Sequence, residues 1–133
     1  MNISASLKNS AGSNVVTVAT NESQKIINIP AKTEGQGSSV NGGELLFLAL
    51  ATCFCNDVYR EAAKRKMQIE SVEVKVSGNF GKEGEPGSNI VYEATVRSTS
   101  SDDEIEDLIK YVDTVAEIHN TLRLGTEVKL KVA

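Results

Sequence analysis

The residues best suited to do chemistry in this chain are two cysteines, one histidine and one arginine. Cys53 and Cys55 lie in the segment Ala51-Thr52-Cys53-Phe54-Cys55, while His119, the only histidine, and Arg123 lie far downstream. A thiolate is a nucleophile, and a neighbouring imidazolium or guanidinium group lowers the pKa of a thiol. The residue types therefore point to thiol chemistry, with Cys53 as the nucleophile and His119 and Arg123 as its activators.

The two cysteines cannot act as a redox pair if their segment is helical. At about 100° per residue, Cys53 and Cys55 point to nearly opposite faces, so a disulfide between them requires unwinding. Cys55 shares its face with Leu48 and Val58, which favours a structural thiol in the core. Cys53 stands where an apolar face becomes polar at Asp57, as in the wall of a pocket. A small buried residue at a helix boundary is the alternative for Cys53, and an ordinary core or surface residue is the alternative for His119.

Activation of Cys53 has to come from outside its own helix. Asp57, one turn further on, raises the pKa of the thiol, and Arg60 offsets this effect only if it folds back. The positive end of the helix lies too far away to help. Another segment or a second subunit must therefore supply the activating group. A zinc site formed by Cys53, Cys55 and His119 is disfavoured because the thiols diverge and no fourth ligand is evident. We predict no metal and no cofactor.

A long helix of about residues 42–66 carries the cysteines. Asn41 is a suitable N-cap, with Glu44 as its capping-box partner. The first half of this helix is apolar nearly all round, which indicates burial, and the second half is amphipathic. A helix of that length spans roughly 36 Å. This is long for so small a domain, and it suggests a central element covered by sheet from two chains.

The elements around this helix predict an α+β fold with antiparallel sheets. Short strands are expected within residues 1–29, followed by a polar, glycine-rich loop over residues 32–43. Strict alternation over 71–78 and again over 89–98 predicts a hairpin. Ser101 and Glu104 open an amphipathic helix. A short helix at about 115–122 ends at Gly125, and alternating residues 128–132 predict a last strand.

Composition limits the possible classes of function. The chain has 133 residues, 40% hydrophobic, with a net charge of −4, which fits one globular domain covering residues 1–133. The densest basic cluster, Lys64-Arg65-Lys66, is typical of a helix end, and no stretch is strongly basic, so nucleic acid is not an expected partner. The apolar run of residues 45–55 is too short to cross a bilayer, and no secretory signal is recognisable. We expect a cytoplasmic protein with reduced thiols.

Three segments resemble one known family. The helix signature Gly42-Gly43-Glu44-Leu45-Leu46, continued by Leu48-Ala49-Leu50-Ala51-Thr52-Cys53, is similar to that of the OsmC-like proteins, which include osmotically inducible protein C and the organic hydroperoxide resistance (Ohr) proteins. The strand MQIESVEVKVSG after the helix and the late segment AEIHNTLRLGTEV also resemble this family. The resemblance covers roughly residues 42–132.

The resemblance implies an α+β fold in which two chains intertwine as a homodimer, with two equivalent sites at the subunit interface. Family members reduce organic hydroperoxides in the response to oxidative stress. A thiolate attacks the peroxide and becomes a sulfenic acid, and a second cysteine then closes a disulfide that dithiols reopen. The implied partners are a second copy of the chain, a small organic hydroperoxide and an external thiol or dithiol reductant.

Only part of the family's catalytic set is carried by this sequence. Cys53 matches the cysteine of the central helix, and Glu44 matches the glutamate of the helix start. The second family cysteine has no counterpart, because Ala116 stands at its position and Glu117 at that of the following proline. The catalytic arginine of the N-terminal part is also missing, since the first arginine is Arg60.

Two functions follow from this incomplete set. The first is a one-cysteine, thiol-dependent peroxidase with Cys53 as the nucleophile, assisted by Glu44, His119 and Arg123. The alternative is a non-enzymatic dimeric member of the family that binds a small apolar or thiol-bearing ligand at its interface. The pKa of Cys53 separates these two functions, because a nucleophile needs a thiolate and a binding scaffold does not. A different thiol chemistry on the same fold is a third hypothesis.

Overall fold

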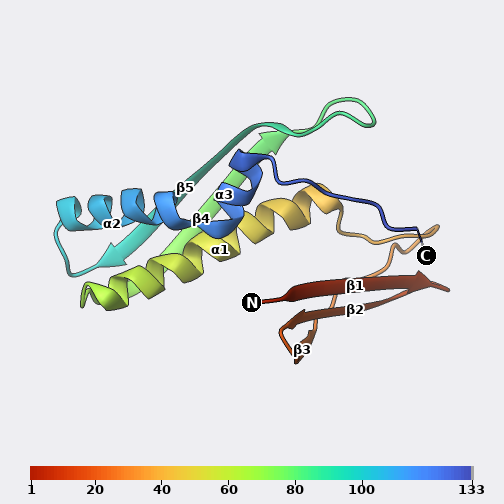
Figure 1. Cartoon of the computed structure of the whole chain (residues 1–133), viewed down its shortest axis with the longest axis horizontal. Helices are drawn as coiled ribbons and strands as arrows, with labels where there is room; N and C mark the ends of the chain where they lie inside the picture. Colours follow the sequence, from red (N-terminus) through yellow and green to blue (C-terminus); the bar gives the residue numbers. More distant parts are fainter. Residues whose placement is uncertain (133) are drawn as a thin grey trace. The chain divides into compact units, whose positions relative to one another are not determined.

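The computed structural model describes residues 1–132 and divides the chain into two compact units, Met1–Leu45 and the residues from Leu46 onward (Figure 1). The elements are mixed α and β, with two antiparallel sheets and three helices within the described residues. This architecture confirms the predicted α+β class. Along the same residues, no helix is both long and apolar enough to cross a membrane.

The N-terminal unit is built on a three-stranded meander. Strands β1 (Ile3–Ser10), β2 (Ser13–Thr20) and β3 (Ser23–Ile26) are antiparallel and neighbour one another in chain order. Ala11 and Gly12 connect the first two strands, both with positive φ angles of 47° and 74°. Such a two-residue turn matches the twist of the strands it joins, which explains the tight hairpin.

The polar segment predicted as a loop is held by asparagine side chains. Asn9 receives a hydrogen bond from the backbone N–H of Gly37 (3.1 Å) and donates one to the carbonyl of the same residue (3.2 Å). Asn14 donates to the carbonyl of Ile29 at 2.9 Å. These side chains satisfy backbone groups that have no sheet partner, and they order a segment that contains little regular structure.

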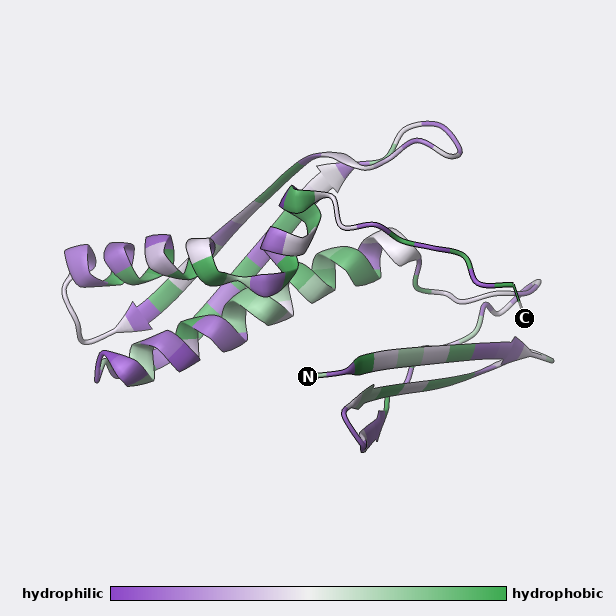
Figure 2. Ribbon diagram, viewed as in Figure 1, coloured by the Kyte–Doolittle hydropathy of each residue, from purple (hydrophilic) through white to green (hydrophobic). Residues whose placement is uncertain are grey.

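Helix α1 (Gly42–Lys64) begins with the predicted capping box. The side chain of Asn41 accepts from the N–H of Glu44 (2.8 Å), and the Glu44 carboxylate accepts from the N–H of Asn41 (3.0 Å). These reciprocal bonds satisfy two otherwise unpaired donors at the helix start. Figure 2 shows that the first half of α1 is mostly hydrophobic and that the second half alternates with polar residues.

A hairpin and two further helices complete the second unit. Strands β4 (Ile69–Asn79) and β5 (Ser88–Ser98) pair antiparallel, with Val72 opposite Val96 on one face. Helix α2 (Asp102–Val115) is capped by Ser101, whose hydroxyl accepts from the N–H of Glu104. Helix α3 (Glu117–Leu124) ends at Gly125, which adopts a left-handed conformation with φ of 68°. The hairpin, both helix positions and both capping signals were predicted from the sequence.

The core of this unit lies where α1, α2 and the hairpin meet. Aliphatic and aromatic side chains from one face of α1 pack against inward-facing residues of β5 and α2, as the 3.6-residue and two-residue periodicities require. Phe54 is the one aromatic residue among the buried side chains of this core. The buried residues of this core are Phe54, Val58, Ala62, Val96, Leu108, Val112 and Ala116.

Two predictions about local structure are wrong. Residues 128–132 form no strand, and Val128 and Leu130 are 96% and 90% exposed, because no strand of the described chain pairs with them. Cys55 is only partly buried and Leu48 is 60% exposed, although Val58, which shares their predicted face, is buried. The buried side of α1 carries Phe54 and Val58, and Cys55 lies at its edge.

Candidate functional site

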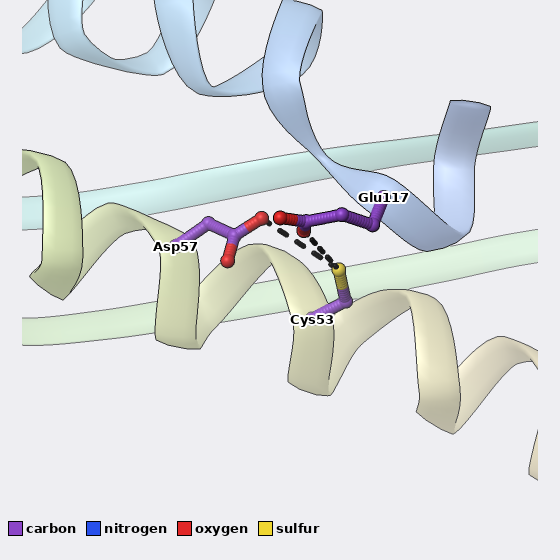
Figure 3. A group of neighbouring side chains, drawn as sticks. All are labelled: Cys53, Asp57 and Glu117. Atoms are coloured by element: carbon purple, nitrogen blue, oxygen red, sulfur yellow. Dashed lines mark hydrogen bonds between the residues drawn. The ribbon is translucent and has the colours of Figure 1, made fainter. Parts of the chain in front are cut away.

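Cys53 lies on α1 opposite the start of α3, between two carboxylates. Its thiol donates a hydrogen bond toward Asp57 Oδ2, with Sγ–Oδ2 at 3.7 Å, and lies 3.9 Å from Glu117 Oε2 (Figure 3). Asp57 is one helical turn further along α1, whereas Glu117 is the first residue of α3. Because a thiol has one proton, it can donate to only one of these oxygens at a time.

The start of α3 also presents a backbone donor to the sulfur. Ala116 caps this helix without any side-chain hydrogen bond, so the N–H groups of the first turn have no side-chain acceptor at the cap position. The N–H of Ile118 acts on Cys53 and lowers the pKa of its thiol. A negative charge on the sulfur would therefore be partly stabilised by the positive end of α3.

Burial, together with the two carboxylates, outweighs this stabilisation. Burial is the largest effect on Cys53 and raises the pKa of its thiol, and the charges of Asp57 and Glu117 raise it further. The pKa of the thiol consequently lies above its ordinary value. This confirms the predicted influence of Asp57, and it shows that the thiol is protonated in its resting state at neutral pH.

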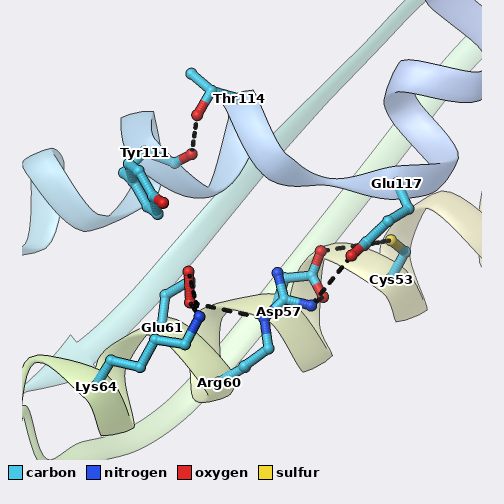
Figure 4. A network of polar contacts seen from close by, with 8 residues as sticks. All are labelled: Cys53, Asp57, Arg60, Glu61, Lys64, Tyr111, Thr114 and Glu117. Atoms are coloured by element: carbon cyan, nitrogen blue, oxygen red, sulfur yellow. Dashed lines mark hydrogen bonds and ion pairs between the residues drawn. The ribbon is translucent and has the colours of Figure 1, made fainter.

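Arg60 holds the two carboxylates together. One guanidinium nitrogen lies 3.0 Å from Asp57 Oδ1 and 3.2 Å from Glu117 Oε1. Figure 4 draws these side chains together. Each carboxylate thus directs one oxygen to Arg60 and the other to the Cys53 sulfur. The arginine compensates the charge of the acids, and no hydrogen bond joins it to the thiol within residues 1–132.

The two carboxylates differ in their affinity for a proton. Burial raises the pKa of Asp57 above its ordinary value, and the adjacent Glu117 raises it further. The pKa of Glu117 is lowered, first by its own backbone N–H and then by Asp57 and Arg60. Asp57 is therefore the more basic carboxylate of the pair and Glu117 the less basic one, and both face the same thiol.

A second ion pair continues along the same face of α1. The Glu61 side chain is buried, and its carboxylate lies 2.7 Å from Lys64 Nζ and 3.6 Å from Arg60 Nε (Figure 4). The hydrogen bond from Lys64 lowers the pKa of Glu61. Glu61 therefore stays ionised and helps to fix the position of Arg60 beside the thiol site.

The two predicted activators lie elsewhere in the chain. Only 4% of the surface of His119 is exposed. Its ring packs edge-on against the ring of Tyr92, with 4.5 Å between the ring centroids. Arg123 lies 2.6 Å from Asp113 and donates to its carboxylate. Within the described residues neither side chain hydrogen-bonds to Cys53, so any part they play in its chemistry remains a prediction.

The remaining predicted residue, Glu44, serves as a helix cap in this structure. Its carboxylate is engaged with the backbone of Asn41. Sequence reasoning missed Glu117, although a signal for it was present. Ala116 stands at the position of the family's second cysteine, and Glu117 follows it directly. An acidic residue at the start of the helix that approaches Cys53 could have been expected to face the thiol.

The cluster also has the ligand types and spacing of a metal site. One ligand atom from each of Cys53, Asp57 and Glu117 lies within 4.8 Å of the others. However, Arg60 already supplies the positive charge between the two carboxylates. We therefore read the cluster as a thiol site with paired acids.

Comparison with known proteins places this architecture in a family. The sequence profile described as OsmC-like protein matches residues 35–131. An OsmC-like protein from Mycoplasma pneumoniae is 21% identical with a TM-score of 0.63, covering 92% of this chain and 86% of that chain. Organic hydroperoxide resistance protein OhrB of Bacillus subtilis is 18% identical with a TM-score of 0.56, covering 98% and 97%.

A third solved structure, an organic hydroperoxide resistance protein OsmC from Legionella pneumophila, has 18% identity and a TM-score of 0.58, with 92% of this chain and 90% of that chain covered. At these identities the structural likeness shows the shared fold. No match was found among curated proteins. The profile match spans the cysteine helix, the hairpin and both later helices, so the chain belongs to the OsmC-like protein family.

Proposed function

We propose that this protein is a one-cysteine, thiol-dependent reductase of small organic hydroperoxides. The observation that carries the proposal is the partly exposed Cys53 sulfur, which contacts two carboxylates of unequal proton affinity at the start of α3. The names of the Bacillus subtilis and Legionella pneumophila neighbours, both hydroperoxide resistance proteins, support the choice of substrate.

The paired acids can move the protons that the reaction requires. Glu117 accepts the thiol proton as the Cys53 sulfur attacks one peroxide oxygen and the O–O bond breaks. The carboxylic acid formed at Glu117 then gives this same proton to the departing alkoxide, so both carboxylates are ionised again at the end of the step. The products are Cys53 sulfenic acid and an alcohol, so sulfur loses two electrons and the peroxide gains them. The Ile118 N–H favours the negative charge that develops on sulfur during proton transfer.

The catalytic cycle must close through an external thiol. Ala116 occupies the position of the family's second cysteine, and Cys55 points away from Cys53. Two molecules of a small thiol would reduce the sulfenic acid: the first forms a mixed disulfide and releases water, and the second regenerates the Cys53 thiol and releases the small-molecule disulfide. Because the resting thiol is protonated, this turnover should accelerate as the pH rises.

We further propose that the functional unit is a homodimer. Residues 126–132 alternate apolar and charged side chains, as in a half-buried strand, yet they have no partner within the described chain. The three-stranded sheet has two open edges, β1 and β3. Exposed edges and an unpaired strand sequence both favour association. If this segment added to the sheet of a second copy, the segment would gain a strand partner and one open edge of the sheet would be paired.

The peroxidase proposal is tested by following cumene hydroperoxide consumption with dithiothreitol as the reductant. The wild type and Cys55→Ser should both exceed the protein-free rate, and Cys53→Ser should fall to it. Cys55→Ser is the matched control, because it removes a thiol from the same helix without touching the acid pair.

Equal rates for all three proteins would disprove the proposal. A second variant, Glu117→Gln, keeps the size of the side chain but removes the proton acceptor. It should lower the rate by about 10²-fold or more if Glu117 acts as the general base. An unchanged rate would exclude Glu117 as the general base. The role of Cys53 as the nucleophile is tested separately by Cys53→Ser.

A further inference from the structure

The charges around Cys53 select which kind of thiol can approach it to close the catalytic cycle. An external thiol has to bring its own sulfur within bonding distance of the Cys53 sulfur. Any charged group that it carries close to that sulfur therefore meets the charges around Cys53. Those charges are the carboxylates of Asp57 and Glu117, with oxygens 3.7 Å and 3.9 Å from Sγ (Figure 3).

Glu117 is the carboxylate that an incoming molecule can reach. Its side chain is 62% exposed, whereas that of Asp57 is 7% exposed. Its Oε1 atom pairs with Arg60, and its Oε2 atom faces the sulfur. A carboxylate oxygen has lone pairs for more than one hydrogen bond, so Oε2 can also accept from a bound molecule. A thiol that approaches Cys53 therefore meets a negatively charged acceptor beside the sulfur.

Arg60 does not cancel the charge of the acid pair. Two ionised carboxylates and one guanidinium group leave one net negative charge, and the adjacent pair of Glu61 and Lys64 is balanced. Within residues 1–132 the guanidinium makes no hydrogen bond to the thiol, whereas both carboxylates lie within 4 Å of it. Because charge interactions weaken with distance, a cation next to the sulfur is attracted and an anion is repelled.

We infer that the reductant of Cys53 is a small aminothiol, whose ammonium group lies two carbons from its sulfur and pairs with Glu117. From ordinary bond lengths, the nitrogen and sulfur of such a molecule lie about 4 Å apart when it is extended. This reach is similar to the 3.9 Å between Cys53 Sγ and Glu117 Oε2. A thiol that carries a carboxylate or sulfonate is repelled instead. The inference rests on the peroxidase function proposed above, because it names the reductant of that cycle.

Reduction by an aminothiol proceeds in two balanced steps. The aminothiol thiolate first attacks the sulfur of the Cys53 sulfenic acid. An S–S bond forms, the S–O bond breaks, and hydroxide takes up the proton of the aminothiol and leaves as water. A second aminothiol thiolate then attacks the sulfur of the first, so that the S–S bond to Cys53 breaks and Cys53 recovers its proton. Two aminothiols are oxidised to one disulfide, and the sulfenic sulfur gains two electrons.

Charged thiosulfonates test this selection without peroxide. Methanethiosulfonates that carry a 2-aminoethyl, 2-hydroxyethyl or 2-sulfonatoethyl group are applied to the Cys55→Ser protein, which has Cys53 as its one thiol. The Cys53 thiolate breaks the S–S bond of the reagent, forms a mixed disulfide and releases methanesulfinate. Each rate is divided by the rate of the same reagent with 2-mercaptoethanol. The cationic reagent should react about tenfold faster than the anionic one at low salt, and the ratio should fall as salt is added.

Variants at position 117 assign the preference to Glu117. Glu117→Gln should lower the ratio of cationic to anionic rates by about threefold or more, and Glu117→Lys should invert it. A change in the pKa of Cys53 alters the rates of all three reagents alike, so it cancels in the ratio. Glu106→Gln is the matched control and should keep the original ratio, because Glu106 is also 62% exposed and ion-paired, but on α2.

Turnover then tests the reductant itself. With cumene hydroperoxide as the oxidant, cysteamine should support a rate about tenfold above that of 3-mercaptopropionate when the thiolate concentrations are equal. Glu117→Gln should narrow this difference, whatever it does to the absolute rates.

Three results would overturn the inference: equal normalised rates for the three thiosulfonates, a cationic preference that persists in Glu117→Gln, or equal turnover with cysteamine and 3-mercaptopropionate. None of them touches the peroxidase proposal, which is read from peroxide consumption with dithiothreitol. By contrast, a protein that prefers the cationic thiosulfonate but consumes no peroxide with dithiothreitol or cysteamine would overturn the peroxidase function, and with it the role of an aminothiol as reductant.

Discussion

The Cys53 sulfur and the Glu117 carboxylate come from helices far apart in the sequence and lie 3.9 Å apart. Glu117 reaches this position because the chain leaves its helical path at Ala116, between α2 and α3, and restarts with Glu117 as the first helical residue. An acid at the start of a helix is favourable for that helix, but here it opposes ionisation of the thiol. The site therefore combines a nucleophile with neighbours that keep it protonated.

We predict that Cys53 reacts with iodoacetamide along a pH profile whose inflection lies above that of an ordinary cysteine. Glu117→Gln should move the inflection to lower pH, because it removes a negative charge that disfavours the thiolate. Asp57→Asn should act in the same direction. Alkylation rates measured in the Cys55→Ser background report Cys53 alone. Glu70→Gln, on β4, serves as a control, and an inflection that is equal in all variants would contradict the electrostatic account.

Local signals in the sequence predicted most of the fold. Ser101 and Asn41 have short polar side chains three residues before a glutamate, and this pattern specifies a helix start whatever surrounds it. The alternation of Val72, Val74 and Val76 likewise fixed which face of β4 is apolar. Such features depend on neighbours in sequence, so they can be read before the fold is known.

Features that depend on distant partners could not be predicted in this way. The periodicity of α1 separated Cys53 from Cys55 correctly, yet it placed Cys55 in the core, because periodicity does not say which face another element covers. The alternation at Val128 and Leu130 indicated a strand, but a strand also needs an edge to pair with. Similarly, the proximity of Glu117 to Cys53 arises from the packing of α3 against α1.

His119 should make the stability of the protein depend on pH in mildly acidic solution. Its pKa is lowered in the folded state, so below its ordinary value of about 6.5 the unfolded chain binds a proton that the folded chain resists. The contribution of neutral His119 to the free energy of unfolding is therefore fully present above that pH, and it is lost as the pH falls. The surrounding charges, Arg123 and Asp113, keep their ionisation in this range, since the pKa of Arg123 is raised and that of Asp113 is lowered.

Urea denaturation at intervals from about pH 7 to pH 5 would measure this decline. His119→Phe has no imidazole to protonate and should show a flatter dependence over the same range. A decline of equal slope in the variant would assign the effect to carboxylates elsewhere in the protein.

A second cysteine at position 116 should turn the site into a two-cysteine system. Ala116 is buried in the core against which Cys53 packs, directly before the two residues whose groups act on the Cys53 sulfur. In Cys55→Ser/Ala116→Cys, a stoichiometric amount of cumene hydroperoxide should therefore yield an intramolecular disulfide. Thiol counting and mass spectrometry detect it. A sulfenic acid that is trapped by dimedone, with no disulfide formed, would show that the two sulfurs cannot meet.

The exposed segment after α3 should control assembly. Leu130 is 90% exposed and lies in an alternating sequence without a strand partner in the described chain. If this segment adds to the sheet of a second copy, Leu130→Asp places a charge on the buried face of the new strand and should convert the dimer into a monomer. Sedimentation equilibrium measures the change in mass. Lys129→Asp reverses a charge on the opposite face, so it is the matched control and should remain dimeric. A wild-type protein that sediments as a monomer, or a dimer that both variants preserve, would exclude this segment as the dimerisation element.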